Sequence, residues 1–188
     1  MKLTRSPRRA LAAIAIASVA ILVPAVALAS SATTAAPKAP AVTRCRVSQV
    51  TPWLGIPGDQ SAGSTSYQLE ISNISRHTCT LYGYPGVLAT RDGSQLGSPA
   101  GRNPSHPRTL LVLRPGSTVH VILRIADVYN YPPGACKPAK ANMLKVYAPG
   151  DFGWHYVPLT FEACSKKGPV YLQVSTAISG TGIPLYSH

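Results

Sequence analysis

Four cysteines are the residues whose chemistry is easiest to predict: Cys45, Cys79, Cys136 and Cys164. No Cys-x-x-Cys pair occurs, and the nearest histidine, His77, lies two residues from Cys79, a spacing unlike that of a zinc site. An even number of cysteines behind an export signal favours disulfides. Three pairings are possible. We prefer Cys45–Cys79 and Cys136–Cys164, because each closes a loop of moderate length within one half of the domain.

Residues that could catalyse a reaction are sparse. A serine hydrolase needs a nucleophile on a sharp turn with a base in reach, yet Gly-x-Ser-x-Gly is absent and Ser105-His106 falls in a proline-rich segment. A glycosidase needs paired carboxylates, and the only acids are Asp59, Glu70, Asp92, Asp127, Asp151 and Glu162. Of these, Asp92 and Asp151 sit beside turn glycines, and Glu70 is expected on the outer face of its strand. We therefore predict no catalytic site, no metal site and no cofactor.

A basic segment is the first candidate for binding. It contains Arg102, His106, Arg108 and Arg114 and could attract phosphate-bearing wall polymers or acidic lipid headgroups. The alternative is a solvated loop whose charge keeps the protein soluble.

Aromatic residues are the second candidate. Tyr129, Tyr131, Trp154, His155 and Tyr156 could form a platform for sugar or protein, provided that their two loops converge. The alternative is that these rings pack across strands or enter the core.

The N-terminal residues predict export. Basic residues precede an apolar run, Ala10–Ala29, that ends in Ala27-Leu28-Ala29, so we expect a signal peptide over residues 1–29. About 20 apolar residues can also span a bilayer. The cleavage pattern favours removal of the apolar run instead, so we expect no stable membrane span in the mature protein. Residues 30–43 are an expected disordered leader, and the folded domain covers 44–188. The mature chain keeps 14 basic and six acidic residues, a net charge of +8.

Strands must position all these residues. Tyr67–Ile74, Cys79–Tyr82 and Ser117–Ile125 show the alternation of half-buried strands. Further short strands are expected at Arg44–Val50, Val87–Thr90, Thr109–Leu113, Met143–Tyr147, Trp154–Phe161 with an interruption at Pro158, and Val170–Val174. We expect loops at Thr51–Ser66, Gly97–Arg108 and Asp127–Asn142, a type II turn at Tyr84-Pro85-Gly86 and a hairpin at Asp92-Gly93. This pattern predicts an all-β, antiparallel β-sandwich with two disulfides; a partly closed barrel is the alternative.

The same residues resemble a known family. Cys45 is followed by Tyr-x-Leu-x-Ile-x-Asn at Tyr67–Asn73 and by Cys-Thr-Leu-x-Gly-Tyr-Pro-Gly-Val at Cys79–Val87. Then come Leu-x-Pro-Gly at Leu113–Gly116, Cys136 and Cys164. Over roughly Arg44–Ser179 the chain resembles the secreted bacterial family known as domain of unknown function 4232, which is common in actinobacteria. The resemblance implies an exported immunoglobulin-like domain without an assigned activity.

These observations favour a secreted, non-catalytic interaction domain at or outside the cell envelope. An anionic cell-wall polymer or an envelope protein is the expected partner, and no nucleic acid is expected. An envelope-polymer hydrolase and a purely structural wall domain are the alternatives.

Overall fold

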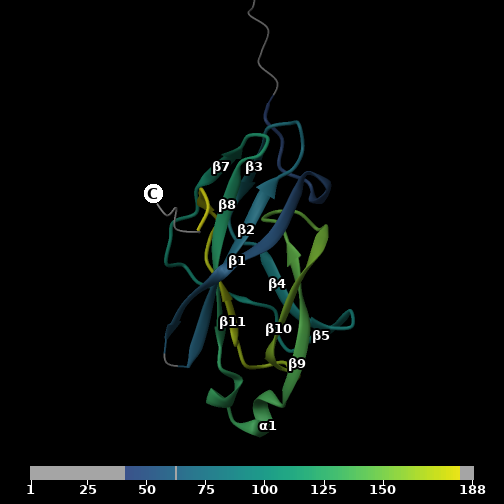
Figure 1. The fold of residues 1–188 in the computed structure, drawn as a ribbon, viewed down its shortest axis with the longest axis vertical. Coiled ribbons are helices and arrows are strands. Elements are labelled where there is room, and N and C mark those ends of the chain that lie inside the picture. Colours follow the sequence, from purple (N-terminus) through teal and green to yellow (C-terminus); the bar gives the residue numbers. More distant parts are fainter. Residues whose placement is uncertain (1–40, 62, 183–188) are drawn as a thin grey trace, which may run out of the picture. The chain divides into compact units, whose positions relative to one another are not determined.

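Two larger sheets and one small one make up the part of the chain that the structure describes (Figure 1). The structure is a computed structural model that describes residues 41–61 and 63–182, so the expected signal peptide (1–29) and most of the expected leader (30–43) lie outside the described residues. Thr43 is described and already belongs to the folded part, because its carbonyl accepts a hydrogen bond from the backbone N–H of Thr80 at 2.9 Å.

The first sheet has the order β1-β2-β8-β11-β6, with β12 also paired to β8. Every pair is antiparallel except β11 with β6, which is parallel. Its strands are β1 (Val50–Ser61), β2 (Ser64–Asn73), β6 (Gly101–Arg102), β8 (Thr118–Ala126), β11 (Leu172–Val174) and β12 (Ile178–Ser179).

The second sheet is antiparallel and has the order β10-β9-β4-β5. Its strands are β4 (Gly86–Arg91), β5 (Ser94–Leu96), β9 (Pro138–Tyr147) and β10 (Trp154–Cys164). The small sheet pairs β3 (Cys79–Tyr82) with β7 (Leu110–Leu113), and the helical elements are η1 (Val47–Gln49), η2 (Val128–Asn130) and α1 (Pro133–Cys136). The predicted all-β class is confirmed.

The strand order can be compared with that of an immunoglobulin domain. When β1, β2 and β8 take positions A, B and E, and β4, β5, β9 and β10 take C, C′, F and G, the larger sheets read A-B-E and G-F-C-C′. This order matches the immunoglobulin pattern. One difference is that β11, from the C-terminal part of the chain, lies beside E where strand D is usually found.

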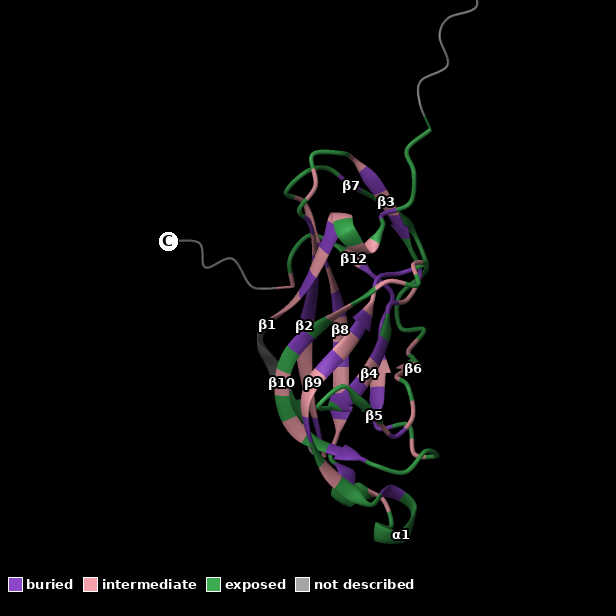
Figure 2. Cartoon of the chain, turned by 90° about the vertical axis from the view of Figure 1, so that its right-hand side faces the viewer, coloured by how far each residue is buried: buried purple, intermediate pink, exposed green. Residues whose placement is uncertain are grey.

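The core is formed by the buried residues that alternate with more exposed ones along the strands of both larger sheets (Figure 2). On β8, Val119, Val121, Leu123 and Ile125 are buried, as the alternation of the sequence predicts. They belong to one hydrophobic cluster together with residues of β4 and β9, among them Val87, Leu144 and Val146. Shared burial of this kind is what a two-sheet sandwich requires.

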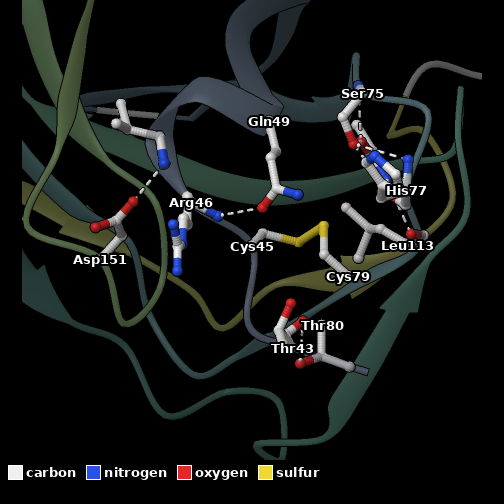
Figure 3. The surroundings of a disulfide bond; sticks show 12 residues. Thr43, Cys45, Arg46, Gln49, Ser75, His77, Cys79, Thr80, Leu113 and Asp151 are labelled. Carbon is white, nitrogen blue, oxygen red and sulfur yellow. Dashed lines mark hydrogen bonds between the residues drawn. A yellow bond between two sulfur atoms is a disulfide. The ribbon is translucent and has the colours of Figure 1, made fainter. Parts of the chain in front are cut away.

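Both predicted disulfides, Cys45–Cys79 and Cys136–Cys164, are confirmed. The first, shown in Figure 3, ties the start of the domain to β3. The N–H of Cys45 also donates to the carbonyl of Thr80 in this strand. The second ties α1 to the end of β10, where the N–H of Lys166 donates to the carbonyl of Cys136.

Several local predictions were wrong. Arg44–Val50 is not a strand, because Val47–Gln49 form η1 and β1 begins only at Val50. The expected loop Gly97–Arg108 contains the short strand β6. Thr51–Ser66 is not a loop: β1 runs to Ser61 as an edge strand, and two register shifts around Pro57 accommodate its prolines. β9 begins at Pro138, inside the expected loop Asp127–Asn142. The positive φ near Tyr84 belongs to Gly83, at 95°, whereas Gly86 begins β4, so no type II turn forms there.

Candidate binding surface

Trp154 and Tyr156 lie side by side on β10. Their ring centroids are 4.7 Å apart, and 43% of Trp154 and 41% of Tyr156 are exposed. His155 lies between them and bonds elsewhere: its Nε2 is 2.9 Å from the carbonyl oxygen of Val47. Two of the five expected platform residues therefore share one face of the second sheet.

Tyr129 and Tyr131 do not join them, so the expected convergence of the two loops is wrong. The η2 helix that carries Tyr129 lies beside the other end of β10, where Val128 and Phe161 line one pocket. Phe161 is seven residues from Trp154, which is about 23 Å along a strand. The hydroxyl of Tyr131 donates to the carbonyl of Val170 at 3.1 Å.

β9 supplies the neighbours that the sequence did not indicate. The register pairs Trp154 with Tyr147 and Tyr156 with Lys145. The Nζ of Lys145 lies 4.3 Å from the ring centroid of Trp154 and 5.5 Å from that of Tyr147. We call these four residues the aromatic face. Only the pairing of β9 with β10 brings these four side chains together. The sequence of each strand by itself shows only which residues alternate between its two faces, and does not show which residue of the other strand lies opposite.

The aromatic face continues over β4. Gly86 pairs with Tyr147, and Leu88 pairs with Lys145. A Cβ at Gly86 would lie 3.3 Å from the Cβ and Cδ2 of Tyr147, so this ring rests directly on the glycine. Phe152, in the turn between β9 and β10, is 95% exposed. A run of exposed aromatic side chains on a sheet face is typical of an interaction surface.

The basic residues separate into two places. The guanidinium carbons of Arg102 and Arg108 lie 5.6 and 5.9 Å from the ring centroid of Tyr84. Arg114 does not join them, because it follows Leu113 at the opposite end of β7 from Arg108. His106 is exposed, and its carbonyl accepts a hydrogen bond from the hydroxyl of Thr176 at 3.3 Å.

Glu70 departs from the sequence prediction. Its side chain is on the outer face of β2 but is fully buried, with 0% exposure, because the chain near Gly182 covers it. Oε1 accepts the N–H of Gly182 at 2.9 Å, and Oε2 has no partner among the described residues. Burial raises the pKa of Glu70, although the bond from Gly182 and the nearby His120 act in the opposite direction.

Three aspartates have local structural roles. Asp127 caps η2 by accepting the N–H of Tyr129 at 2.9 Å, and Asp92 accepts the side-chain amide of Asn142 at 2.9 Å. Asp151 accepts backbone N–H groups of Val47, Phe152 and Gly153. The residues that the structure describes contain no group of three His, Cys, Asp or Glu side chains that could hold a metal ion.

The fold and this surface define an all-β, disulfide-bonded domain with an exposed aromatic sheet face. The family model described as Domain of unknown function (DUF4232) matches residues 45–177, and the chain belongs to this family, as its motifs predict. No curated protein and no solved structure gives a significant match. In the described part of the chain, no helix has the length and apolar character needed to cross a membrane. Two disulfides are typical of an oxidising, extracellular-type environment.

Proposed function

We propose that this protein is an exported, non-catalytic interaction domain that binds a carbohydrate polymer of the cell envelope through the aromatic face. The observation that carries the proposal is the group formed by the exposed Trp154 and Tyr156 with the half-buried Tyr147 and Lys145. Indole and phenol rings offer flat apolar area together with a polar N–H or O–H. Sugar rings have the matching character, with apolar C–H faces and polar edges.

The rigidity of the sheet supports this choice. The four residues of the aromatic face belong to two hydrogen-bonded strands, which fix their backbone, and contacts between Lys145 and the rings of Trp154 and Tyr147 and between Trp154 and Tyr156 restrict the side chains before a ligand arrives. Binding then loses less side-chain entropy than it would on a loop. The cation of Lys145 already contacts two rings and is placed to attract an acidic substituent on the polymer.

Export is supported by the signal-like residues 1–29 and by two disulfides. A mature net charge of +8 favours association with anionic envelope material by long-range attraction.

The test is co-sedimentation of the mature protein with purified peptidoglycan and with insoluble wall polysaccharide, followed by titration of soluble fragments. We expect Trp154→Ala and Tyr156→Ala each to weaken binding about tenfold or more, a typical effect for an aromatic anchor. Tyr129→Ala is the matched control, because this tyrosine is 72% exposed at the other end of β10 and should bind like the wild type.

Equal binding by the wild type and the two aromatic-face variants would contradict the proposal. Release of soluble sugar from the polymer by the wild-type protein would indicate a hydrolase instead.

A further inference from the structure

Tyr84 lies next to the aromatic face, in the segment that joins β3 to β4. From Cys79 to Ala89 every odd-numbered residue is buried and every even-numbered residue is half-buried or exposed. Gly86 and Leu88, in β4, therefore point outward together. Tyr84, which precedes the strand, is half-buried and packs in part against the hydrophobic core. Gly86 underlies the ring of Tyr147, so Tyr84 follows directly beyond the edge of the aromatic face.

The distance between the two clusters is short. β10, β9 and β4 are neighbours, so the row from Trp154 through Tyr147 to Gly86 spans about 10 Å, and Tyr84 is about 7 Å further along the chain. Trp154 and Tyr84 are thus roughly 12 Å apart between Cα atoms. One oligosaccharide segment can contact both.

Arg102 and Arg108 converge on Tyr84 from a segment that is fastened at several points. Arg102 pairs with Val174 of β11, and the N–H of Asn103 donates to the carbonyl of Val174 at 2.8 Å. The N–H of Ala100 donates to the carbonyl of Val87 at 2.8 Å, which holds the residues just before β6 against β4. β4 and β6 are labelled next to each other in Figure 2. The two guanidinium groups are therefore held near one ring.

These two cations lack a described acidic partner. The carboxylates of Glu70, Asp92, Asp127 and Asp151 accept their described hydrogen bonds from Gly182, Asn142, Tyr129 and the turn at Phe152, respectively, in other parts of the fold. Two positive charges beside one ring repel each other, and an anion bound between them removes that repulsion. The planar donor fork of arginine matches the oxygens of phosphate in geometry and charge.

We propose that Arg102, Arg108 and Tyr84 form a phosphate-binding subsite next to the aromatic face, so that the ligand is a phosphate-bearing glycan. The phosphate contacts the two guanidinium groups while neighbouring sugars stack on Trp154, Tyr147 and Tyr156. The sugar part of this inference rests on the proposed function, whereas binding of the phosphate group does not.

The experiment uses three probes: a phosphomannan, the same mannan after chemical removal of its phosphate, and polygalacturonate, which carries carboxylates. The variants are the doubles Arg102→Ala/Arg108→Ala and Arg102→Lys/Arg108→Lys. The double Arg76→Ala/Arg114→Ala is the matched control, since it removes the same charge from two exposed arginines away from Tyr84. Circular dichroism checks that every variant is folded.

We expect the Arg102→Ala/Arg108→Ala double to bind phosphomannan at least tenfold more weakly, with less than twofold change for the dephosphorylated mannan. The lysine double should fall between, because lysine keeps the charge and loses the bidentate contact. The control double should change binding less than twofold. At 0.5 M salt the phosphate-dependent part should largely disappear.

Unchanged phosphomannan binding by the alanine double would overturn the subsite, and so would an equal loss for the control double. An equal loss of affinity for polygalacturonate would overturn the preference for phosphate. Trp154→Ala separates the two proposals: it must weaken binding of both mannans if the proposed function holds. If it changes neither while the arginine double abolishes phosphomannan binding, the proposed function fails and the subsite stands.

Discussion

Replacing Glu70 with glutamine should stabilise this protein at neutral pH. Glu70 is fully buried, and its Oε2 has no described partner. Gln68 is two residues earlier on the same face of β2, and its Oε1 is also buried without a partner. The same stretch covers both, because a Cβ at Gly182 would lie 2.4 Å from the Oε1 of Gln68. A glutamine in place of Glu70 keeps the acceptor for Gly182, removes the buried charge, and adds an N–H donor on the face of β2 that carries the unpartnered Oε1 of Gln68.

The magnitude follows from the cost of burying an unsatisfied polar group, about 1–3 kcal/mol. We therefore expect Glu70→Gln to raise the free energy of unfolding by about 1–3 kcal/mol at pH 7. The sign is opposite to that of most core substitutions, which destabilise. The substitution stabilises because it restores a hydrogen bond and removes a buried charge.

The stabilisation should depend on pH. Burial raises the pKa of Glu70 above its ordinary value of 4.5, so between 4.5 and the folded-state pKa the folded protein holds a proton that the unfolded chain releases. The wild-type free energy of unfolding then decreases as pH rises through this window. The gap between Glu70→Gln and the wild type should widen over the same range and become constant above it. His120, which pairs with Glu70 across β2 and β8, is the charged group facing it.

The assay is urea denaturation from pH 4 to pH 8, with midpoints converted to free energies. Glu162→Gln is the control, because Glu162 is exposed on β10 and should show almost no gap at any pH. Repeating the series in a His120→Gln background removes the coulombic influence of His120 on Glu70. A destabilised Glu70→Gln variant, or a gap that stays the same at all pH values, would refute the reasoning about the buried carboxylate.

Three further predictions concern the fold. Replacing both Cys136 and Cys164 with serine should lower the free energy of unfolding by about 3–4 kcal/mol, since the bond closes a sequence separation of 28 residues; a loss below about 1 kcal/mol by thermal denaturation would show that the loop is ordered without it. Gly97→Ala should lower the free energy of unfolding by more than about 2 kcal/mol, because φ is +64° and a Cβ would lie 2.4 Å from the carbonyl oxygen of Cys164. The control Gly116→Ala, at φ +76° with open space around the Cβ, should lower it by about 1 kcal/mol. Equal losses for the two variants in thermal denaturation would contradict the clash at Gly97. Partial burial opposes ionisation of Asp151, but hydrogen bonds from three backbone N–H groups outweigh it and hold the pKa of Asp151 below 3.8. The stabilisation that these bonds give is therefore present above pH 3.8 and is lost as pH falls through the folded-state pKa. Asp151→Asn should make the free energy of unfolding less dependent on pH in this range, and an unchanged dependence would exclude this role of Asp151.

The sequence by itself determined the all-β class, the core face of the clearest strands and the disulfide pairing. Alternation in β8 assigns Val121 and Leu123 to the core without knowledge of a partner strand, because successive side chains of any strand point to opposite faces. The pairing of Cys136 with Cys164 could also be predicted from the sequence, because the two cysteines are only 28 residues apart and close a loop of moderate length. The motif around Gly83-Tyr84-Pro85-Gly86 identified the family.

Tertiary structure decided which faces are exposed and which side chains meet. Glu70 alternates like an exposed residue, yet the segment near Gly182, more than a hundred residues later, covers it. Trp154 gains Lys145 as a neighbour through the register of β9 and β10, while Tyr129 is placed at the far end. Periodicity along a chain records only the side of its own strand to which a residue points. The strand or segment that packs against that side is selected by contacts distant in sequence, and no local pattern encodes them.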